Sequence, residues 1–279
     1  MKKMTIGIVV VGKDKEGLVA SFTNFIFQNN GNIESLNQNV INSLFGMHME
    51  TSFTKLDIKK FNTDLKSIAK KYNVDAYTHH EIGSKKNIAI FVTKESHCLS
   101  IILNSRKSLR GIIKVIVGTD PTLKSMANKA KIPFVLVEDK NQEKAESKLI
   151  TICKKYNIDL IVLARYMRIL SSNFVWRYPN RIINIHPSLL PAFSGAFAYA
   201  QAYERGAKII GVTSHYVTEN LNQGPIIAQE SFKVDPKHSL TILKNKGQKL
   251  EAKTLLHAVK LHLNNKLDVR WRKVHLKIK

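Results

Sequence analysis

Cysteine is scarce in this chain of 279 residues, where only Cys98 and Cys153 occur, far apart and without metal-ligand neighbours. Two such residues cannot build a disulfide framework, and so low a count is typical of a reducing compartment. Long apolar runs are also missing, since none approaches the ~18 residues that a membrane-spanning helix needs. We therefore expect a cytoplasmic, globular protein without a membrane anchor.

Acidic residues are few as well: 21 Asp and Glu stand against 44 Lys and Arg, a net charge of +23. A basic surface attracts nucleic acid, acidic membranes or polyanionic small molecules. The basic residues are spread over the whole chain, apart from a basic tail at residues 270–279, and no zinc-finger spacing or RNA-binding aromatic motif accompanies them. We expect no nucleic-acid partner and no membrane partner, and part of the lysine excess is attributable to compositional bias, given the many Asn and Ile residues that accompany it.

The histidine pairs of the chain do not form a recognisable metal motif. His79 and His80 are adjacent, and His257 and His262 share one predicted helix. Neither pair has the spacing or the carboxylate or thiol companions that are typical of a zinc site. The sequence therefore predicts no metal site.

The first third of the chain has the pattern of a small α+β domain. Apolar patterning predicts the order strand, helix, strand, strand, helix, strand over residues 5–82. This is the ferredoxin-like order, in which helices pack on one side of an antiparallel sheet. The polar run at 83–86 is the predicted linker, which gives an N-terminal domain at 1–84 and a second domain at 85–279.

From Ile88 onwards, short apolar strands alternate with helices, including helices predicted at 121–131, 141–156 and 240–262. Such alternation indicates a Rossmann-like, mainly parallel sheet with helices on both faces. In open sheets of this kind, ligands bind outside the carboxyl ends of the strands. The rule directs attention to the residues that follow Ala164 and Ile185.

Two polar side chains stand at the second of these strand ends. Asn184 and His186 are two residues apart, so they share one face of a strand. An amide beside an imidazole can donate two hydrogen bonds to a carbonyl oxygen as it gains negative charge. An isolated Asn-x-His more often packs or caps a strand end, but here a second histidine follows at His215, with a polar loop that closes on Gly224 and Pro225.

These motifs resemble a known family. Residues 183–191, the Met-Arg-x-Leu segment that ends at Leu170, and residues 215–227 are similar to the formyltransferases that use 10-formyltetrahydrofolate. Residues 14–19 and the N-terminal element order resemble an ACT domain, a small regulatory module. That fusion, together with residues 93–99 and 202–206, resembles the formyltetrahydrofolate deformylases over essentially the whole chain.

The resemblance implies hydrolysis of 10-formyltetrahydrofolate to formate and tetrahydrofolate, which supplies formate for purine synthesis and balances the one-carbon folate pools. It implies folate as substrate and no tightly bound cofactor. The phosphate-gripping glycine loop of the glycinamide ribonucleotide enzymes is missing after Val92, so water is the expected formyl acceptor. The implied catalytic residues are Asn184, His186 and the residue at position 222. The implied folate-binding residues are Met167, Arg168, Ile169, Leu170, His215, Val217 and Thr218.

The sequence departs from the family pattern where an aspartate is required, because Asn222 stands there. Asparagine can orient water but cannot accept a proton. The usual Arg-Pro-Tyr-His is also replaced, by residues 197–200. Three hypotheses remain open: a deformylase with reduced activity, a folate-binding regulatory pseudoenzyme, and a formyltransferase acting on an amine.

The ACT resemblance also implies partners. It suggests a small amino-acid effector, such as glycine or methionine, and a homo-oligomer assembled through sheet edges. The basic composition suggests that the folate is polyglutamylated, because lysine side chains attract its anionic tail.

Overall fold

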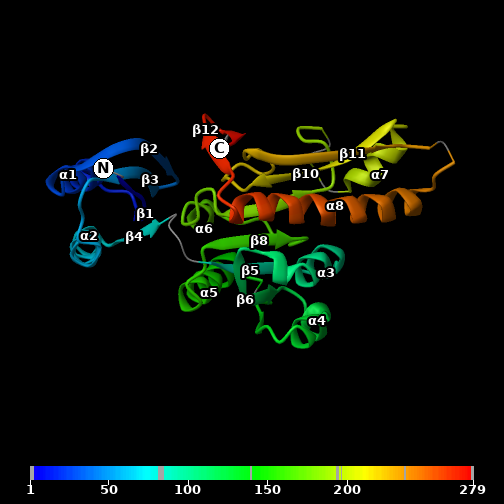
Figure 1. Ribbon diagram of the computed structural model, residues 1–279, viewed down its shortest axis with the longest axis horizontal. Coiled ribbons are helices and arrows are strands. Elements are labelled where there is room, and N and C mark those ends of the chain that lie inside the picture. The colour runs from blue at the N-terminus through cyan, green and yellow to red at the C-terminus, as the bar shows by residue number, and fades with distance from the viewer. Residues whose placement is uncertain are drawn as a thin grey trace. The chain divides into compact units, whose positions relative to one another are not determined.

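A computed structural model describes residues 3–80, 85–138, 140–192, 195, 197–235 and 237–277. The chain forms two compact units (Figure 1). Unit 1 comprises Met1–Ser84 and Ser171–Pro179, and unit 2 comprises Lys85–Leu170 and Asn180–Lys279. The predicted domain boundary stays a prediction, and its linker lies largely outside the described residues. The short segment Ser171–Pro179 belongs with unit 1 although it lies within the second predicted domain.

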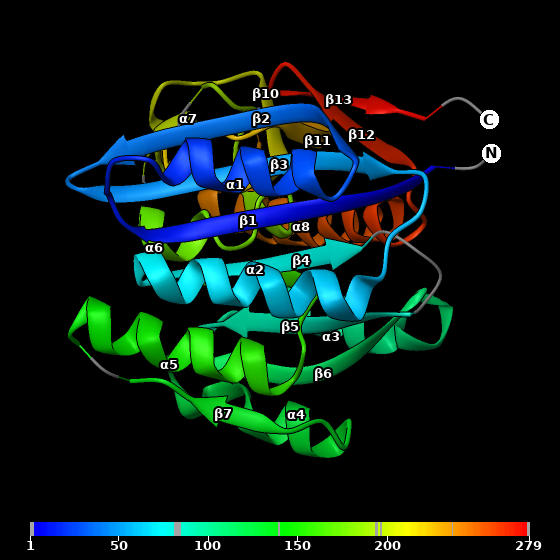
Figure 2. The same cartoon turned by 90° about the vertical axis from the view of Figure 1, so that its left-hand side faces the viewer.

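Unit 1 is a four-stranded antiparallel sheet with two helices on one face (Figure 2). The sheet order is β2-β3-β1-β4. The strands are β1 (Met4–Lys13), β2 (Gly31–Ile41), β3 (Leu44–Phe53) and β4 (Val74–His80), and the helices are α1 (Leu18–Gln28) and α2 (Ile58–Tyr72). Alternate β1 residues, Ile6, Ile8 and Val10, point into the helix-covered core. The ferredoxin-like prediction is confirmed.

The turn between β2 and β3 is a tight hairpin turn. Asn42 and Ser43 both have positive φ, 49° and 61°, as a two-residue hairpin turn requires. Leu44–Phe53 therefore pairs with β2 from its first residue, Leu44, which lies opposite Ile41.

The opposite face of the unit 1 sheet receives the segment Ser171–Pro179, which contains α6 (Ser172–Val175). The Tyr77 hydroxyl donates a hydrogen bond to the Arg177 carbonyl, and the Arg177 guanidinium pairs with Asp75. Gly46 leaves room for the Trp176 ring, because a Cβ there would lie 2.3 Å from it.

Unit 2 is a seven-stranded sheet with the order β11-β10-β9-β8-β5-β6-β7. The five strands from β9 to β7 run parallel, whereas β10 and β11 are antiparallel. The strands are β5 (Lys86–Val92), β6 (Gly111–Gly118), β7 (Phe134–Leu136), β8 (Leu160–Ala164), β9 (Ile182–His186), β10 (Ile209–Tyr216) and β11 (Ile226–Lys233). The mainly parallel, Rossmann-like prediction is confirmed.

Helices cover both faces of this sheet, so that β8 is buried throughout and its neighbours β5 and β9 are mostly buried. In Figure 2, α5 lies in front of β5 and β6, and α8 lies behind the sheet. The helices are α3 (His97–Asn104), α4 (Lys124–Lys129), α5 (Gln142–Lys155), α7 (Ala198–Glu204) and α8 (Leu240–Leu263), with 3₁₀ turns at Arg106–Ser108 and Pro121–Leu123.

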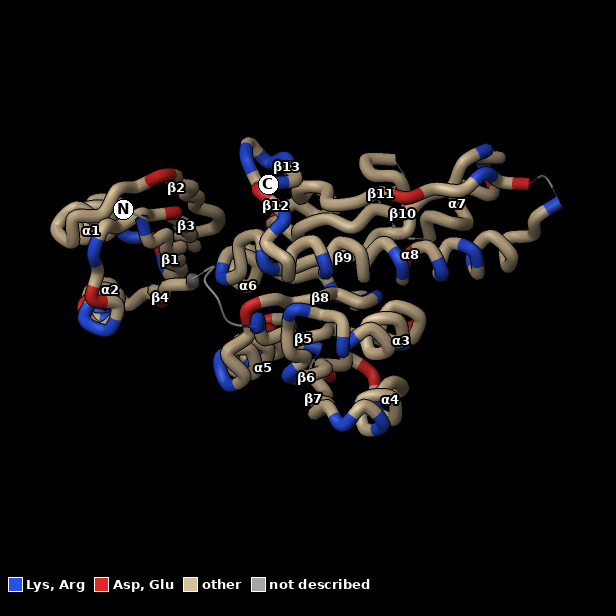
Figure 3. The backbone as a smooth tube through the Cα atoms, in the orientation of Figure 1, with Lys and Arg blue, Asp and Glu red and all other residues tan. Residues whose placement is uncertain are grey.

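One sequence expectation needs correction. The helix predicted at 121–131 begins as the 3₁₀ turn and becomes α-helical only over Lys124–Lys129, because Asp120 caps a turn with Pro121 at its first position. The C-terminal region also contains a hairpin, β12 (Leu267–Arg270) and β13 (Lys273–Leu276). Figure 3 shows Lys and Arg distributed along both units rather than gathered in one stretch. Among the described residues, no helix is long and apolar enough to cross a membrane.

Candidate active site

The topology brings three predicted site segments to one region of the unit 2 sheet. β8 and β9 are parallel neighbours, with Leu163 opposite Asn184, so their carboxyl ends meet at one edge. β10 runs antiparallel to β9 and places His215 directly opposite Asn184. The predicted crevice residues therefore come from adjacent strands.

Asn184 and His215 form a hydrogen-bonded pair. The His215 Nδ1 lies 2.8 Å from the Tyr216 carbonyl oxygen, to which it donates, so its Nε2 is an acceptor. Asn184 Nδ2 lies 3.3 Å from that Nε2 and donates to it. Burial lowers the pKa of His215 to about 4; the Tyr216 carbonyl opposes this effect, and nearby His186 adds to it. His215 is thus neutral near pH 7 and holds the Asn184 amide in one orientation.

His186 is 8% exposed at the end of β9, and the loop that follows it is firmly held. The Thr213 hydroxyl donates to the Ser188 carbonyl (2.7 Å) and accepts from the Leu190 backbone N–H (3.0 Å). The Gln229 amide donates to that same hydroxyl (2.9 Å) and to the Leu190 carbonyl (3.0 Å). Because Thr213 pairs with His186 in the β9–β10 register, one buried threonine fixes the direction in which the chain leaves the histidine.

The segment after β8 presents apolar side chains at the same edge. Met167 and Ile169 are mostly exposed, whereas Leu170 is buried. The Met167 backbone N–H donates to the Thr93 hydroxyl (3.0 Å), and the Gln142 amide donates to the Ile169 carbonyl (3.2 Å). Thus the predicted folate-binding residues Met167, Arg168, Ile169 and Leu170 form an anchored loop with an apolar surface.

Val217 and Thr218 follow β10 at the end of the sheet where β9 begins. The Val217 backbone N–H donates to the carbonyl of Ile182, the first residue of β9 (2.9 Å), whereas His186 is the last. The antiparallel direction of β10 causes this separation. β10 places His215 opposite Asn184, but Val217 and Thr218 leave the strand at the other end of β9, and their folate-binding role stays a prediction.

The chain then turns back toward His215. Gly224 packs against the end of β10, since a Cβ there would lie 1.7 Å from the Tyr216 carbonyl oxygen and 3.4 Å from His215 Nδ1. Asn222, two residues earlier, has a φ of 56°, a conformation that asparagine adopts more readily than most residues. Its role at the reaction centre stays a prediction.

The sequence analysis did not predict a second cluster of buried polar side chains. We call it the Glu251 cluster, formed by Glu251, His97, Arg165 and Tyr199. The fully buried Glu251 carboxylate accepts from the Tyr199 hydroxyl (2.7 Å) and lies 3.2 Å from His97 Nε2 and 3.5 Å from Arg165 Nε. Burial raises the pKa of Glu251, but His97, Arg165 and Tyr199 together outweigh it, so the net pKa is lowered.

The cluster joins four parts of unit 2: the first residue of α3, the loop after β8, α7 and α8. Arg165 has a φ of 62° and immediately precedes the predicted folate loop. One feature of the sequence could have indicated the cluster. Glu251 is a charged residue at an apolar position of the last helix, between Leu250 and Ala252.

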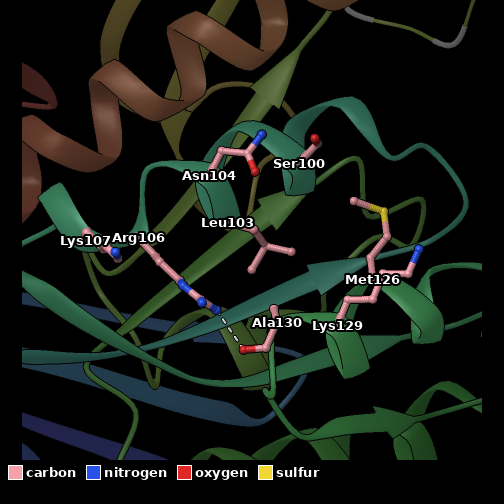
Figure 4. A pocket seen from close by; sticks show the side chains of 8 residues that line it. All are labelled: Ser100, Leu103, Asn104, Arg106, Lys107, Met126, Lys129 and Ala130. Carbon is pink, nitrogen blue, oxygen red and sulfur yellow. Dashed lines mark hydrogen bonds between the residues drawn. The ribbon is translucent and has the colours of Figure 1, made fainter.

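A cavity of about 410 Å³ lies elsewhere in unit 2, between α3 and α4 (Figure 4). It is lined by Ser100, Leu103, Asn104, Arg106, Lys107, Met126, Lys129 and Ala130. The Arg106 guanidinium is committed to the Ala130 carbonyl (2.7 Å). None of the predicted site residues lines this cavity, so it is separate from the candidate active site.

The mainly parallel seven-stranded sheet of unit 2 has the formyltransferase fold, and residues 86–259 match the formyl transferase family. The chain is 36% identical over 275 residues to the formyltetrahydrofolate deformylase of Bacillus subtilis, covering 95% of this chain and 91% of that protein. It is 37% identical to the formyltetrahydrofolate deformylase of Synechocystis, with 96% and 97% covered.

Solved structures give the same result. A formyltetrahydrofolate deformylase from Pseudomonas syringae superposes with a TM-score of 0.68 and 31% identity, covering 100% of this chain and 96% of that one. A phosphoribosylglycinamide formyltransferase from Coxiella burnetii matches with a TM-score of 0.65 and 29% identity, covering 69% of this chain and 94% of that one. The chain belongs to the formyl transferase family, among its formyltetrahydrofolate deformylases.

Proposed function

We propose that the protein hydrolyses 10-formyltetrahydrofolate to formate and tetrahydrofolate. The observation that carries this proposal is the Asn184–His215 hydrogen bond of 3.3 Å beside His186 at the carboxyl end of β9. An amide side chain has two N–H donors. One is used by His215, and the other donates to the formyl oxygen as it gains negative charge.

His186 supplies the second hydrogen bond to the same oxygen. The neutral state of His215 supports this assignment, because two neighbouring imidazoles avoid carrying positive charge at once. Water attacks the formyl carbon, the bond from that carbon to N10 breaks, and N10 takes a proton. A preorganised donor of this kind contributes about 10²–10³-fold to the rate.

Water rather than a phosphorylated amine is the acceptor. The chain after β5 carries Glu95, whose carboxylate accepts from the Gln248 amide (2.9 Å). Lys94 is paired with Asp120 at 3.4 Å. An acidic side chain in this position opposes a phosphate group, and supports hydrolysis over transfer to a nucleotide amine.

Asn222 sets the level of activity. It can orient the attacking water through its amide but cannot take up a proton, and a well-placed acid or base is worth about 10²–10⁴-fold in rate. We therefore expect slow hydrolysis that an Asn222→Asp variant accelerates. Glu219 is three residues away in the same loop; if it serves as a substitute base, a Glu219→Gln variant loses turnover.

The decisive experiment follows formate release from 10-formyltetrahydrofolate by the natural sequence, by Asn222→Asp, and by Asn184→Ala as the inactive control. We expect release by the first, faster release by the second and almost none by the third. Tight folate binding without release by either of the first two contradicts the proposal. Parallel reactions with added amines test formyl transfer, which we expect to be absent.

The finer partner assignments are part of the same proposal. The basic surface attracts polyglutamylated folate, so affinity for it should fall steeply with salt while affinity for the monoglutamate changes little. Unit 1 takes a small amino acid as effector, and the protein is a cytoplasmic homo-oligomer. Titration of glycine and methionine during turnover, together with light scattering, tests the effector and the assembly.

A further inference from the structure

The inference concerns three side chains of unit 1 that the folate chemistry does not use. His48 and Glu50 lie on β3 and His79 lies on β4, with β1 between the two strands. Gly7 of β1 pairs with Glu50 on one side and with His79 on the other. All three side chains point to the sheet face opposite the core that α1 and α2 cover.

Gly7 leaves room for side chains of the two strands that flank β1 to meet on this face. A Cβ at Gly7 would lie 2.1 Å from the Cε1 and Nε2 atoms of His79, so the imidazole occupies the space above β1. The His48 and His79 rings stack with centroids 5.4 Å apart and an interplanar angle of 19°. His48 Nε2 lies 3.8 Å from Glu50 Oε1. One ligand atom from each of the three residues lies within 4.8 Å of the others.

We propose that His48, Glu50 and His79 bind a Zn²⁺ ion. Two imidazole nitrogens and one carboxylate oxygen are a common zinc donor set, with bonds of about 2.0–2.2 Å and a fourth position for water. Ligand atoms around a tetrahedral ion stand roughly 3.3 Å apart for bonds of that length. The His48 Nε2–Glu50 Oε1 separation of 3.8 Å is close to this value, and the paired strands hold all three side chains on one face of the sheet.

The accessibility of the three residues also suits an ion that exchanges with solvent. The His48 side chain is 13% exposed and that of Glu50 is 42% exposed, so the site is held by the sheet yet open on one side. A bound ion joins β3 to β4 across β1. Binding should therefore stabilise unit 1, since a ligand that binds only the folded state shifts the unfolding equilibrium.

Within the part of the chain that the structure describes, one other group of side chains has metal-ligand composition, namely His97, Cys98 and Glu251 in unit 2. Its carboxylate is already held by Tyr199 and Arg165. Burial, with a further contribution from Glu251, raises the pKa of the Cys98 thiol well above its ordinary value. A neutral thiol is a poor zinc ligand, since the thiolate is the binding form. This group therefore serves as the comparison in the experiment.

The test uses the full-length protein after chelator treatment, titrated with Zn²⁺ by calorimetry and with Co²⁺ by visible absorption. We expect one ion per chain and a higher Tm. His48→Ala and His79→Ala should each weaken Zn²⁺ binding by at least ~10–100-fold. Glu50→Gln, a nearly isosteric change on a partly exposed residue, should weaken it without disturbing the circular dichroism spectrum.

Two matched variants keep the result interpretable. His257→Ala removes an exposed histidine of α8, and Cys98→Ser removes the thiol of the comparison group; both should bind Zn²⁺ like the natural sequence. The proposal is overturned if folded His48→Ala, His79→Ala and Glu50→Gln proteins bind as tightly as the natural sequence. It is equally overturned if binding disappears in Cys98→Ser. Neither outcome depends on folate turnover.

Discussion

Unit 2 contains two buried polar centres. They offset the free-energy cost of removing polar groups from water in opposite ways. In the Asn184–His215 pair every group is neutral, and a single chain of hydrogen bonds runs from the amide through the imidazole to the Tyr216 carbonyl. In the Glu251 cluster a fully buried carboxylate is surrounded by a guanidinium, an imidazole and a phenol.

The difference indicates what each centre is for. A neutral pair costs little to bury and keeps one amide donor for a substrate. A buried carboxylate must be compensated by its neighbours, so its partners are committed to one another. We therefore expect changes in the pair to affect catalysis more than stability, and changes in the cluster to affect stability more than catalysis.

The largest effect should come from Glu251→Leu. Removing the carboxylate leaves Arg165 and His97 without their shared partner, and breaking a buried ion pair costs about 3–5 kcal/mol. Urea unfolding followed by circular dichroism measures this loss. Glu251→Gln, which keeps the shape and the hydrogen bond with Tyr199, should lose less. Equal stability of the natural sequence, Glu251→Leu and Glu251→Gln would contradict the stabilising role of the Glu251 cluster.

Asn184→Ala should show the reverse profile. Loss of one preorganised donor lowers kcat by about 10²–10³-fold. Leaving His215 Nε2 without its donor costs only about 1–3 kcal/mol of stability. Formate release and urea unfolding of the same preparation test both statements. A variant that unfolds early but retains its kcat would assign the pair a structural role.

Much of this could be predicted from the sequence, because strand periodicity and strand-end motifs are local features. The parallel sheet and the neighbourhood of Asn184 follow from short apolar runs that end in polar residues. The Glu251 cluster could not be predicted in the same way. Its members come from segments far apart in the sequence, and only the packing of α7 and α8 on the sheet brings Tyr199 to Glu251.

The position of Val217 and Thr218 illustrates a second limit. They lie close to His215 in the sequence, but the antiparallel register of β10 against β9 carries them to the end where β9 begins. Their folate-binding role stays a prediction. Strand direction is a property of the whole sheet, so a linear motif does not specify it.

Acid should destabilise the two centres in different pH windows. The pKa of His215 is about 4 in the folded protein and about 6.5 in an unfolded chain. The unfolded state thus binds the extra proton first, so His215 contributes stability above pH 6.5 that is lost as the pH falls to 4. The loss amounts to about 3 kcal/mol. Burial also lowers the pKa of His262, so this histidine adds to the loss of stability in acid.

Glu251 affects stability at lower pH. Its folded-state pKa is depressed from 4.5, so the stability that it contributes is lost only as the pH falls below 4.5 and the carboxylate is protonated. Urea unfolding between pH 7 and 3.5 should show a His215→Gln variant with a flatter profile from 6.5 to 4. Glu251→Gln should keep that slope and change the profile below 4.5. Identical profiles for the two variants would contradict the separate windows.

Tyr199→Phe should have the smallest effect and isolates a single bond of the Glu251 cluster. The Tyr199 ring packs on α8 at Gly247, where a Cβ would lie 2.3 Å from the ring, and phenylalanine retains that packing. Only the hydrogen bond to Glu251 is lost, and a hydrogen bond to a charged group is worth about 1.5–3 kcal/mol. The loss should be smaller than that of Glu251→Leu, because Arg165 and His97 still hold the carboxylate.

The kcat of Tyr199→Phe tests whether the Glu251 cluster affects catalysis as well as stability. α7 begins within residues 197–200, the segment that departs from the family pattern, so a hydroxyl that fixed this helix for catalysis would change kcat when removed. We expect kcat to stay within a few-fold of the natural value while the unfolding midpoint in urea falls. If kcat drops by 100-fold instead, the Glu251 cluster positions the active site as well as stabilising unit 2. The Glu251 cluster and the Asn184–His215 pair would then both contribute to catalysis.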